Sequence, residues 1–164
     1  MKMSDESLEK DEIIIRNYRT SDYEATLEIL KELHHQYDIG LKEEQWRESS
    51  GLRQFKPNLK RITLIAETKD TGEVVGMGML EAQKNPLGQY IGYLDNWATK
   101  KEYIGKHVGK ILADRAIQIL KSWGCESIRI NVSYDVPEKL IKVFSKTGFN
   151  PILIVLEKKI SEND

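Results

Sequence analysis

Apolar residues recur along this chain with the period of helices in some segments and of strands in others. Residues 21–37 carry one apolar face, which predicts a helix that Ser21 can cap and that ends before Gly40. The apolar positions of that face are Ala25, Leu27, Ile29, Leu30 and Leu33. A second helix is expected over 42–53, and the amphipathic run 110–123 predicts a third.

Short apolar and β-branched runs, bounded by turn residues, predict the strands. These runs are 13–15, 62–67, 74–80, 91–98, 128–132 and 152–156. The Asp-Thr-Gly sequence at 70–72 is typical of a hairpin turn, and Asn-Pro-Leu-Gly at 85–88 makes the next turn. A last helix is expected over 138–146, between the final two strands.

The resulting element order is β-α-α-β-β-β-α-β-α-β. Hairpins pair strands antiparallel, whereas a crossover helix joins parallel strands. The order therefore predicts an α+β fold with a mixed, mostly antiparallel sheet flanked by helices. We expect one domain over 12–160, a flexible tail at 1–11 and a second tail at 161–164.

The composition narrows the classes of function. Twenty-five basic and 26 acidic side chains give a net charge of -1, which does not favour nucleic acid as a partner. No apolar run approaches the roughly 20 residues that cross a bilayer, and the first residues lack the apolar core of a signal peptide. We therefore expect a cytoplasmic protein with no membrane partner. With three histidines and the single Cys125, neither an internal disulfide nor a metal site is expected.

The stretch 100–110, between a predicted strand and a predicted helix, is a candidate phosphate site. The start of a helix offers backbone N–H groups without intrahelical acceptors and the positive end of the helix dipole. Gly105 and Gly109 allow an anion to approach the backbone closely. Positive charge around the turn comes from Lys100, Lys101, Lys106 and Lys110. An ordinary loop with solvated lysines is the simpler alternative.

In this element order, the turn resembles the pyrophosphate loop of the GNAT superfamily of N-acetyltransferases. The family's Gln/Arg-x-x-Gly-x-Gly/Ala pattern falls on residues 104–109, and the run 139–149 resembles the family's last helix with its Gly-Phe ending. The resemblance covers residues 13–158 and also fits the element order. Four positions depart from the family pattern: Ile104 for Gln or Arg, His107 for Gly, Pro137 for Asn and Phe144 for Tyr.

The resemblance implies an acyl-CoA-dependent N-acyltransferase that moves acetyl from acetyl-CoA to a primary amine by direct attack in a ternary complex. Acetyl-CoA would be the co-substrate, with no metal. The residues that would contact it are Trp97, Ala98, Thr99, Ile104, Gly105, Lys106, His107, Val108, Gly109 and Lys110. His107 could donate to a phosphate when protonated, or it could crowd the approach that glycine permits.

Proton transfer needs two further groups. A lysine-like amine has an unperturbed pKa of about 10.4 and must lose a proton before it attacks a thioester. Asp95, in the fourth predicted strand, is the candidate base, and a local pairing role at the strand end is an equal alternative. Many family members protonate the leaving thiolate with the tyrosine that Phe144 replaces. Tyr134 is the candidate substitute, unless it only anchors its own turn.

Strand alternation predicts which of these side chains share a face. On that basis Asp95, Trp97 and Thr99 lie together, opposite Leu94, Asn96 and Ala98.

An acidic and aromatic cluster lies where the family builds the rim of the acceptor pocket. It comprises Tyr37, Asp38, Glu43, Glu44, Trp46 and Glu48, which would attract a small-molecule or peptide amine or simply form a solvated helix face. The four departures also motivate a rival reading, a noncatalytic GNAT-fold module that binds CoA or a protein partner. Homodimer formation is left open.

Overall fold

The computed structural model describes residues 12–37, 40–49, 53, 57–132 and 138–162. The chain forms two compact units, Met1–Asn131 and Val132–Asp164. Residues 1–11, expected as a tail, lie outside the described residues, as do 163–164. The boundaries of the expected domain stay a prediction.

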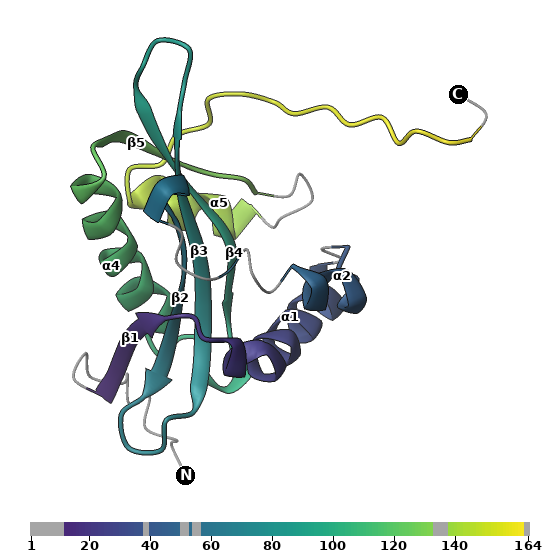
Figure 1. The fold of residues 1–164 in the computed structure, drawn as a ribbon, viewed down its shortest axis with the longest axis vertical. Coiled ribbons are helices and arrows are strands. Elements are labelled where there is room, and N and C mark those ends of the chain that lie inside the picture. The colour runs from purple at the N-terminus through teal and green to yellow at the C-terminus, as the bar shows by residue number, and fades with distance from the viewer. Residues whose placement is uncertain (1–11, 38–39, 50–52, 54–56, 133–137, 163–164) are drawn as a thin grey trace. The chain divides into compact units, whose positions relative to one another are not determined.

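The first unit is built on one five-stranded sheet, counted over the described residues, in the order β1-β2-β3-β4-β5 (Figure 1). The strands are β1 Ile13–Asn17, β2 Arg61–Thr68, β3 Val74–Lys84, β4 Tyr90–Thr99 and β5 Cys125–Ile130. The first four pair antiparallel, and β5 runs parallel to β4 after a helical crossover. The predicted class, a mixed and mostly antiparallel sheet flanked by helices, is confirmed.

Three α-helices of this unit are described. They are α1 Tyr23–Tyr37, α2 Glu43–Glu48 and α4 Val108–Ser122, with short 3-10 turns η2 Thr20–Asp22, η3 Pro57–Leu59 and η4 Lys101–Tyr103. The helix expected over 42–53 is interrupted, because α2 ends at Glu48 and Ser49 leaves helical geometry. Arg53, the next described residue, is again helical. The helix expected from 110 begins two residues earlier, at Val108.

The sheet separates two apolar cores. Leu64, Leu80 and Leu120 belong to the core between the sheet and α4, whereas Ile65 and Met77 belong to the core on the side of α1 and α2 (Figure 1). Successive residues of β2 thus feed opposite cores, as strand alternation requires. Each fully buried aliphatic side chain contributes about 1.5–3 kcal/mol through the area it removes from water.

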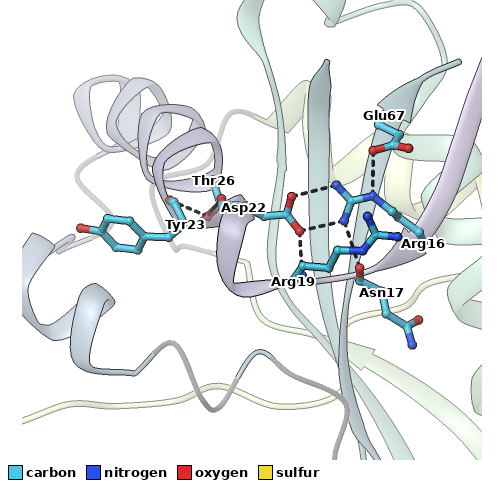
Figure 2. A network of polar contacts seen from close by, with 7 residues as sticks. All are labelled: Arg16, Asn17, Arg19, Asp22, Tyr23, Thr26 and Glu67. Atoms are coloured by element: carbon cyan, nitrogen blue, oxygen red, sulfur yellow. Dashed lines mark hydrogen bonds and ion pairs between the residues drawn. The ribbon is translucent and has the colours of Figure 1, made fainter. Parts of the chain in front are cut away.

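A buried polar network fixes the start of α1 to the sheet. Arg16 on β1 donates to both carboxylate oxygens of Asp22, at 2.7 and 2.8 Å, and to Glu67 on β2 at 2.7 Å (Figure 2). Asp22 is 4% exposed and also accepts from the Arg19 N–H at 2.7 Å. These bonds hold the turn ahead of α1 and so orient the helix that covers one face of the sheet.

The second unit contains α5, Glu138–Lys146, and the turn after it includes a left-handed Gly148 with φ of 93°. Phe144 packs edge-to-face on Phe149, with ring centroids 6.1 Å apart. The closing strand expected over 152–156 is not formed: these residues have no regular structure, and their side chains are 58–91% exposed. A strand requires a hydrogen-bonded neighbour, and apolar sequence alone does not supply one.

Candidate active site

β4 contains a bulge at its centre. Met79 pairs with Asp95 and Met77 with Ala98, so two residues of β4 face the single Gly78 of β3. Asn96 takes a left-handed φ of 50°, which non-glycine residues adopt rarely and Asn more readily than most. Bulges of this kind interrupt the ladder and release backbone groups from it.

The bulge overturns the predicted distribution of side chains along β4. Leu94 and Trp97 both pack against the core under α4, whereas Ala98 belongs to the core on the side of α1. Asp95 lies directly opposite Met79, two residues from Met77, and therefore faces α1 and α2. The expectation that Asp95 shares a face with Trp97 and Thr99 is wrong, because the extra residue reverses the alternation.

Trp97 fills the space between β3 and the start of α4. A Cβ atom at Gly78 would lie 2.3 Å from the Trp97 ring, so the indole occupies the place of a side chain there. A Cβ at Gly109 would meet Thr99 Oγ1 and Trp97 Nε1, each at 3.9 Å. The end of β4 and the first turn of α4 thus face each other across a glycine.

A carboxylate from the neighbouring hairpin holds the loop between β4 and α4. Glu73 binds Lys100 through an ion pair and accepts from Tyr103 Oη at 3.0 Å. The Lys100 N–H also donates to the Val75 carbonyl at 2.8 Å. Hydrogen bonding from Lys100, ahead of that from Tyr103, lowers the pKa of Glu73.

The lysines around the loop are less available than the sequence suggests. Lys100 is paired with Glu73, and Lys110 forms an exposed ion pair with Asp114 at 2.9 Å. The Lys106 ammonium lies over the Tyr103 ring, 5.3 Å from its centroid. Exposed pairs contribute only about 0–1 kcal/mol, so the charge of Lys110 can still turn to a ligand.

Two left-handed residues shape the loop just before α4. Gly105 has φ of 84° and His107, the N-cap residue, has φ of 65°. The imidazole makes no capping hydrogen bond. His107 therefore adopts the backbone conformation that suits glycine, which is the residue the family pattern has at this position.

Backbone donors converge at the first turn of α4. The Lys106 N–H donates to Tyr103 O at 3.2 Å, and the first helical bond runs from Ile111 N to His107 O at 3.0 Å. The N–H groups of Val108, Gly109 and Lys110 precede that bond and have no intrahelical acceptor. Together with the helix dipole, these groups can bind a phosphate or a diphosphate.

The opposite face of β4 carries the candidate base. Asp95 is half-buried, and burial, followed by the charge of Glu81, raises the pKa of its carboxyl. Glu81 is itself held by Arg61 through two hydrogen bonds of 3.0 Å each. A carboxylate with a raised pKa accepts a proton more readily than an ordinary one.

The remaining predicted residues are distributed as follows. Tyr134 and Pro137 lie outside the described residues, as does Asp38 of the proposed acceptor rim. Phe144 belongs to the second unit, in α5. Ile104 is 63% exposed at the start of the loop. Over the described ranges, no cluster of three metal-ligating side chains occurs, and no helix is long and apolar enough to cross a membrane.

A family model, described as the acetyltransferase (GNAT) family, matches residues 23–149. The match spans the bulge of β4, the loop and the first turn of α4. The chain belongs to the GNAT acetyltransferase family. The resemblance drawn from the turn and the element order is thereby confirmed, and family membership supports acetyltransferase activity.

Solved structures of other acetyltransferases share the fold of this GNAT protein. A Trypanosoma brucei acetyltransferase has a TM-score of 0.69 at 22% identity, covering 90% of this chain and 99% of its own. Glucosamine-6-phosphate N-acetyltransferase from Arabidopsis thaliana has a TM-score of 0.70 at 18% identity, and the match covers 91% of this chain and 99% of that one. A ribosomal-protein-alanine N-acetyltransferase from Brucella melitensis has a TM-score of 0.70 at 15% identity, and the match covers 91% of this chain and 99% of that one. No curated protein sequence matches the chain.

Sequence reasoning missed the residues that support the site. Glu73 comes from the hairpin after β2, 27 positions before its partner Lys100, and no local pattern indicates the contact. Glu81 and Arg61 face each other across β2 and β3, which the strand register could have suggested. The bulge at Asn96 had no sequence signal beyond the tolerance of Asn for left-handed geometry.

Proposed function

We propose that this GNAT protein transfers an acetyl group from acetyl-CoA to a primary amine, by direct attack in a ternary complex. The observation that carries the proposal is the left-handed backbone at Asn96 and at His107. Such residues cost free energy and cluster at functional sites. Here they flank one continuous strand, loop and helix start.

The diphosphate of acetyl-CoA would bind at the first turn of α4. The N–H groups of Val108, Gly109 and Lys110 supply donors, and Gly105 with His107 turns the loop backbone toward the same end of the helix. The ion pair of Glu73 with Lys100 keeps this loop in place before the ligand arrives. Preorganised donors bind an anion without a further ordering cost.

The acyl end of the ligand would lie along the end of β4. Trp97 forms the bulge with Asn96, and Ala98 and Thr99 follow it. Backbone groups that the bulge releases from the ladder would align the acyl arm and polarise its carbonyl. Asp95 lies before the bulge and faces the side of α1 and α2, so the amine would approach from that side.

The chemistry then requires one bond to form and one to break. The amine nitrogen attacks the thioester carbon, the C–S bond breaks, and the amine proton passes to Asp95 directly or through water. The sulfur departs as a thiolate, which takes a proton from water or from Tyr134. A thiol with a pKa of about 8.5 costs only about 2 kcal/mol to ionise near neutral pH, so the phenol that Phe144 lacks is not essential.

Release of CoA thiol in the presence of an amine panel tests the proposal. The panel contains polyamines, amino acids, aminoglycosides and peptide N-termini, and a parallel thermal shift with acetyl-CoA measures binding alone. Asp95→Asn should lower turnover by about 10²–10⁴-fold without weakening acetyl-CoA binding. Glu126→Gln, which removes an exposed carboxylate of β5, is the matched control.

Two results would redirect the assignment. Tight binding of acetyl-CoA with no transfer to any amine favours the noncatalytic module that binds CoA or a protein partner. Turnover that is unchanged in Asp95→Asn at every pH would place the base elsewhere or show that none is needed.

A further inference from the structure

Arg53 is a buried cation that has no acidic partner among the described residues. Its side chain is 2% exposed, and it donates from Nη1 to Ser49 Oγ at 3.0 Å and from Nη2 to the Trp46 carbonyl at 2.6 Å. Within the part of the chain that the structure describes, no carboxylate forms an ion pair with it. Buried charges are normally paired, and no described carboxylate supplies the counterion that this guanidinium calls for.

One N–H donor of this guanidinium and one of the neighbouring indole are unsatisfied among the described residues. The Arg53 group stacks on the Trp46 ring at 3.7 Å and lies 5.3 Å from the Tyr18 ring centroid. Arg53 Nε and Trp46 Nε1 are both buried, and neither has a hydrogen-bond partner in the part of the chain that the structure describes. Because the guanidinium lies over the Trp46 ring, Arg53 Nε and Trp46 Nε1 are close neighbours, and both are donors that an anion accepts from.

These donors lie on the same side of the sheet as Asp95. Trp46 and Tyr18 belong to the core on the side of α1 and α2, and the Tyr18 N–H donates to the Thr63 carbonyl at 2.9 Å. Thr63 pairs with Met79, which pairs with Asp95, so the three residues form one row across β2, β3 and β4. At about 4.8 Å per strand, the row is about 10 Å long.

We propose that the amine acceptor also carries a carboxylate, which binds Arg53 and Trp46 while the amine lies at Asp95. The inference rests on the proposed transfer to an amine and names the class of acceptor. Arg53 contacts Tyr18, which binds the Thr63 end of the row, and Asp95 stands at the other end. This separation favours an amino acid whose reacting amine is remote from its carboxylate, as in lysine. Guanidinium and indole N–H groups donate and cannot accept, which suits a carboxylate.

A purely structural role accounts for only part of this arrangement. Arg53 could cap the carbonyl end of α2, since Ser49 and Trp46 lie in its last turn and favour a cation there. That role uses Nη1 and Nη2. It leaves Nε of Arg53 and Nε1 of Trp46 without a function, and those are the donors assigned to the acceptor.

The test compares L-lysine with cadaverine, the same five-carbon amine without the carboxylate. Thiol release is measured at saturating acetyl-CoA, and binding is measured by calorimetry in the presence of CoA. Wild-type protein should show a kcat/KM for lysine about 10- to 100-fold above that for cadaverine, the range expected for hydrogen bonds to a charged group.

Two variants separate recognition from folding. Arg53→Met should lower the kcat/KM for lysine to near that for cadaverine and so abolish most of the preference. Trp46→Phe keeps an aromatic ring and removes only the donor, so it should lower the ratio of the two kcat/KM values in the same direction. Arg115→Met, at an exposed arginine of α4, is the matched control. If circular dichroism shows that Arg53→Met is unfolded, the result for Trp46→Phe alone tests the carboxylate site.

The outcomes distinguish this inference from the proposed function. Equal kcat/KM for the two amines in the wild type would overturn the carboxylate site and leave the transferase intact. If calorimetry shows that lysine binds and that Trp46→Phe weakens this binding, but no acetyl transfer occurs, the carboxylate site is supported and the proposed transferase activity is overturned. Absence of both turnover and lysine binding in the wild type would overturn both.

Discussion

Replacing His107 with glycine should stabilise the protein, because the left-handed backbone at this position suits glycine. A non-glycine residue in this conformation costs about 1–2 kcal/mol. Glycine gives back about 0.5–1 kcal/mol through the greater freedom of the unfolded chain. With φ of 65° and an exposed side chain that makes no capping bond, His107 has little else to lose. The expected net gain in the free energy of unfolding is about 0.5–1 kcal/mol.

Urea denaturation followed by circular dichroism measures this difference, and a thermal melt should rise by about 1–4 °C. His107→Ala is the matched comparison, since it removes the imidazole and keeps the left-handed strain. Gly105→Ala, at φ of 84°, should be destabilised by about 1 kcal/mol for the same reason. If His107→Gly is no more stable than His107→Ala, the strain argument is refuted.

The same variants decide what the imidazole does for acetyl-CoA. If the side chain donates to a phosphate, His107→Ala and His107→Gly should both bind acetyl-CoA more weakly than the wild type. If only the shape of the backbone matters, His107→Gly should retain wild-type affinity. Tighter binding by His107→Gly would show that the imidazole obstructs the ligand.

Three other substitutions test the structure around the site. Gly78→Ala should lower the free energy of unfolding by about 1–3 kcal/mol and shift the fluorescence of Trp97, because the new methyl group overlaps that ring. An unchanged thermal melt would contradict this. Asp22→Asn should cost about 3 kcal/mol, as Arg16 loses its buried partner. Burial raises the pKa of Asp22 but its hydrogen bonds outweigh this and lower it, so its contribution, full above about pH 4, should be lost on acidification through the lower folded-state pKa. Asp95→Asn should instead stabilise the protein relative to the wild type, because burial makes the Asp95 charge unfavourable and raises its pKa. The gain should begin at about pH 4 and be complete above the raised pKa of Asp95. Urea titrations across pH would show no such gain if the carboxyl were solvated.

The sequence predicted the architecture well where local pattern determines it. The strands of the first unit and the helices α1 and α4 follow directly from apolar periodicity, and the loop before α4 was located by its glycines and lysines. These features depend on residues close together in the chain, so a single sequence is enough to find them.

The parts that were missed depend on contacts between distant residues. The ion pair of Glu73 with Lys100 joins two loops, and the pairing of Asp95 with Met79 joins two strands. The strand expected over 152–156 has the right composition, but composition does not provide a partner strand. Alternation failed along β4 because one added residue is enough to exchange the two faces.

The bulge makes Asn96 dispensable for the scaffold. If this residue were deleted, Asp95 would still face Met79, Trp97 would stand opposite Gly78, and Ala98 would keep its pairing with Met77. Every other side chain of β4 would retain its face, and the ladder would become continuous. The chain therefore carries a single amino acid that the sheet does not need, and a protein lacking it separates what the fold requires from what catalysis requires.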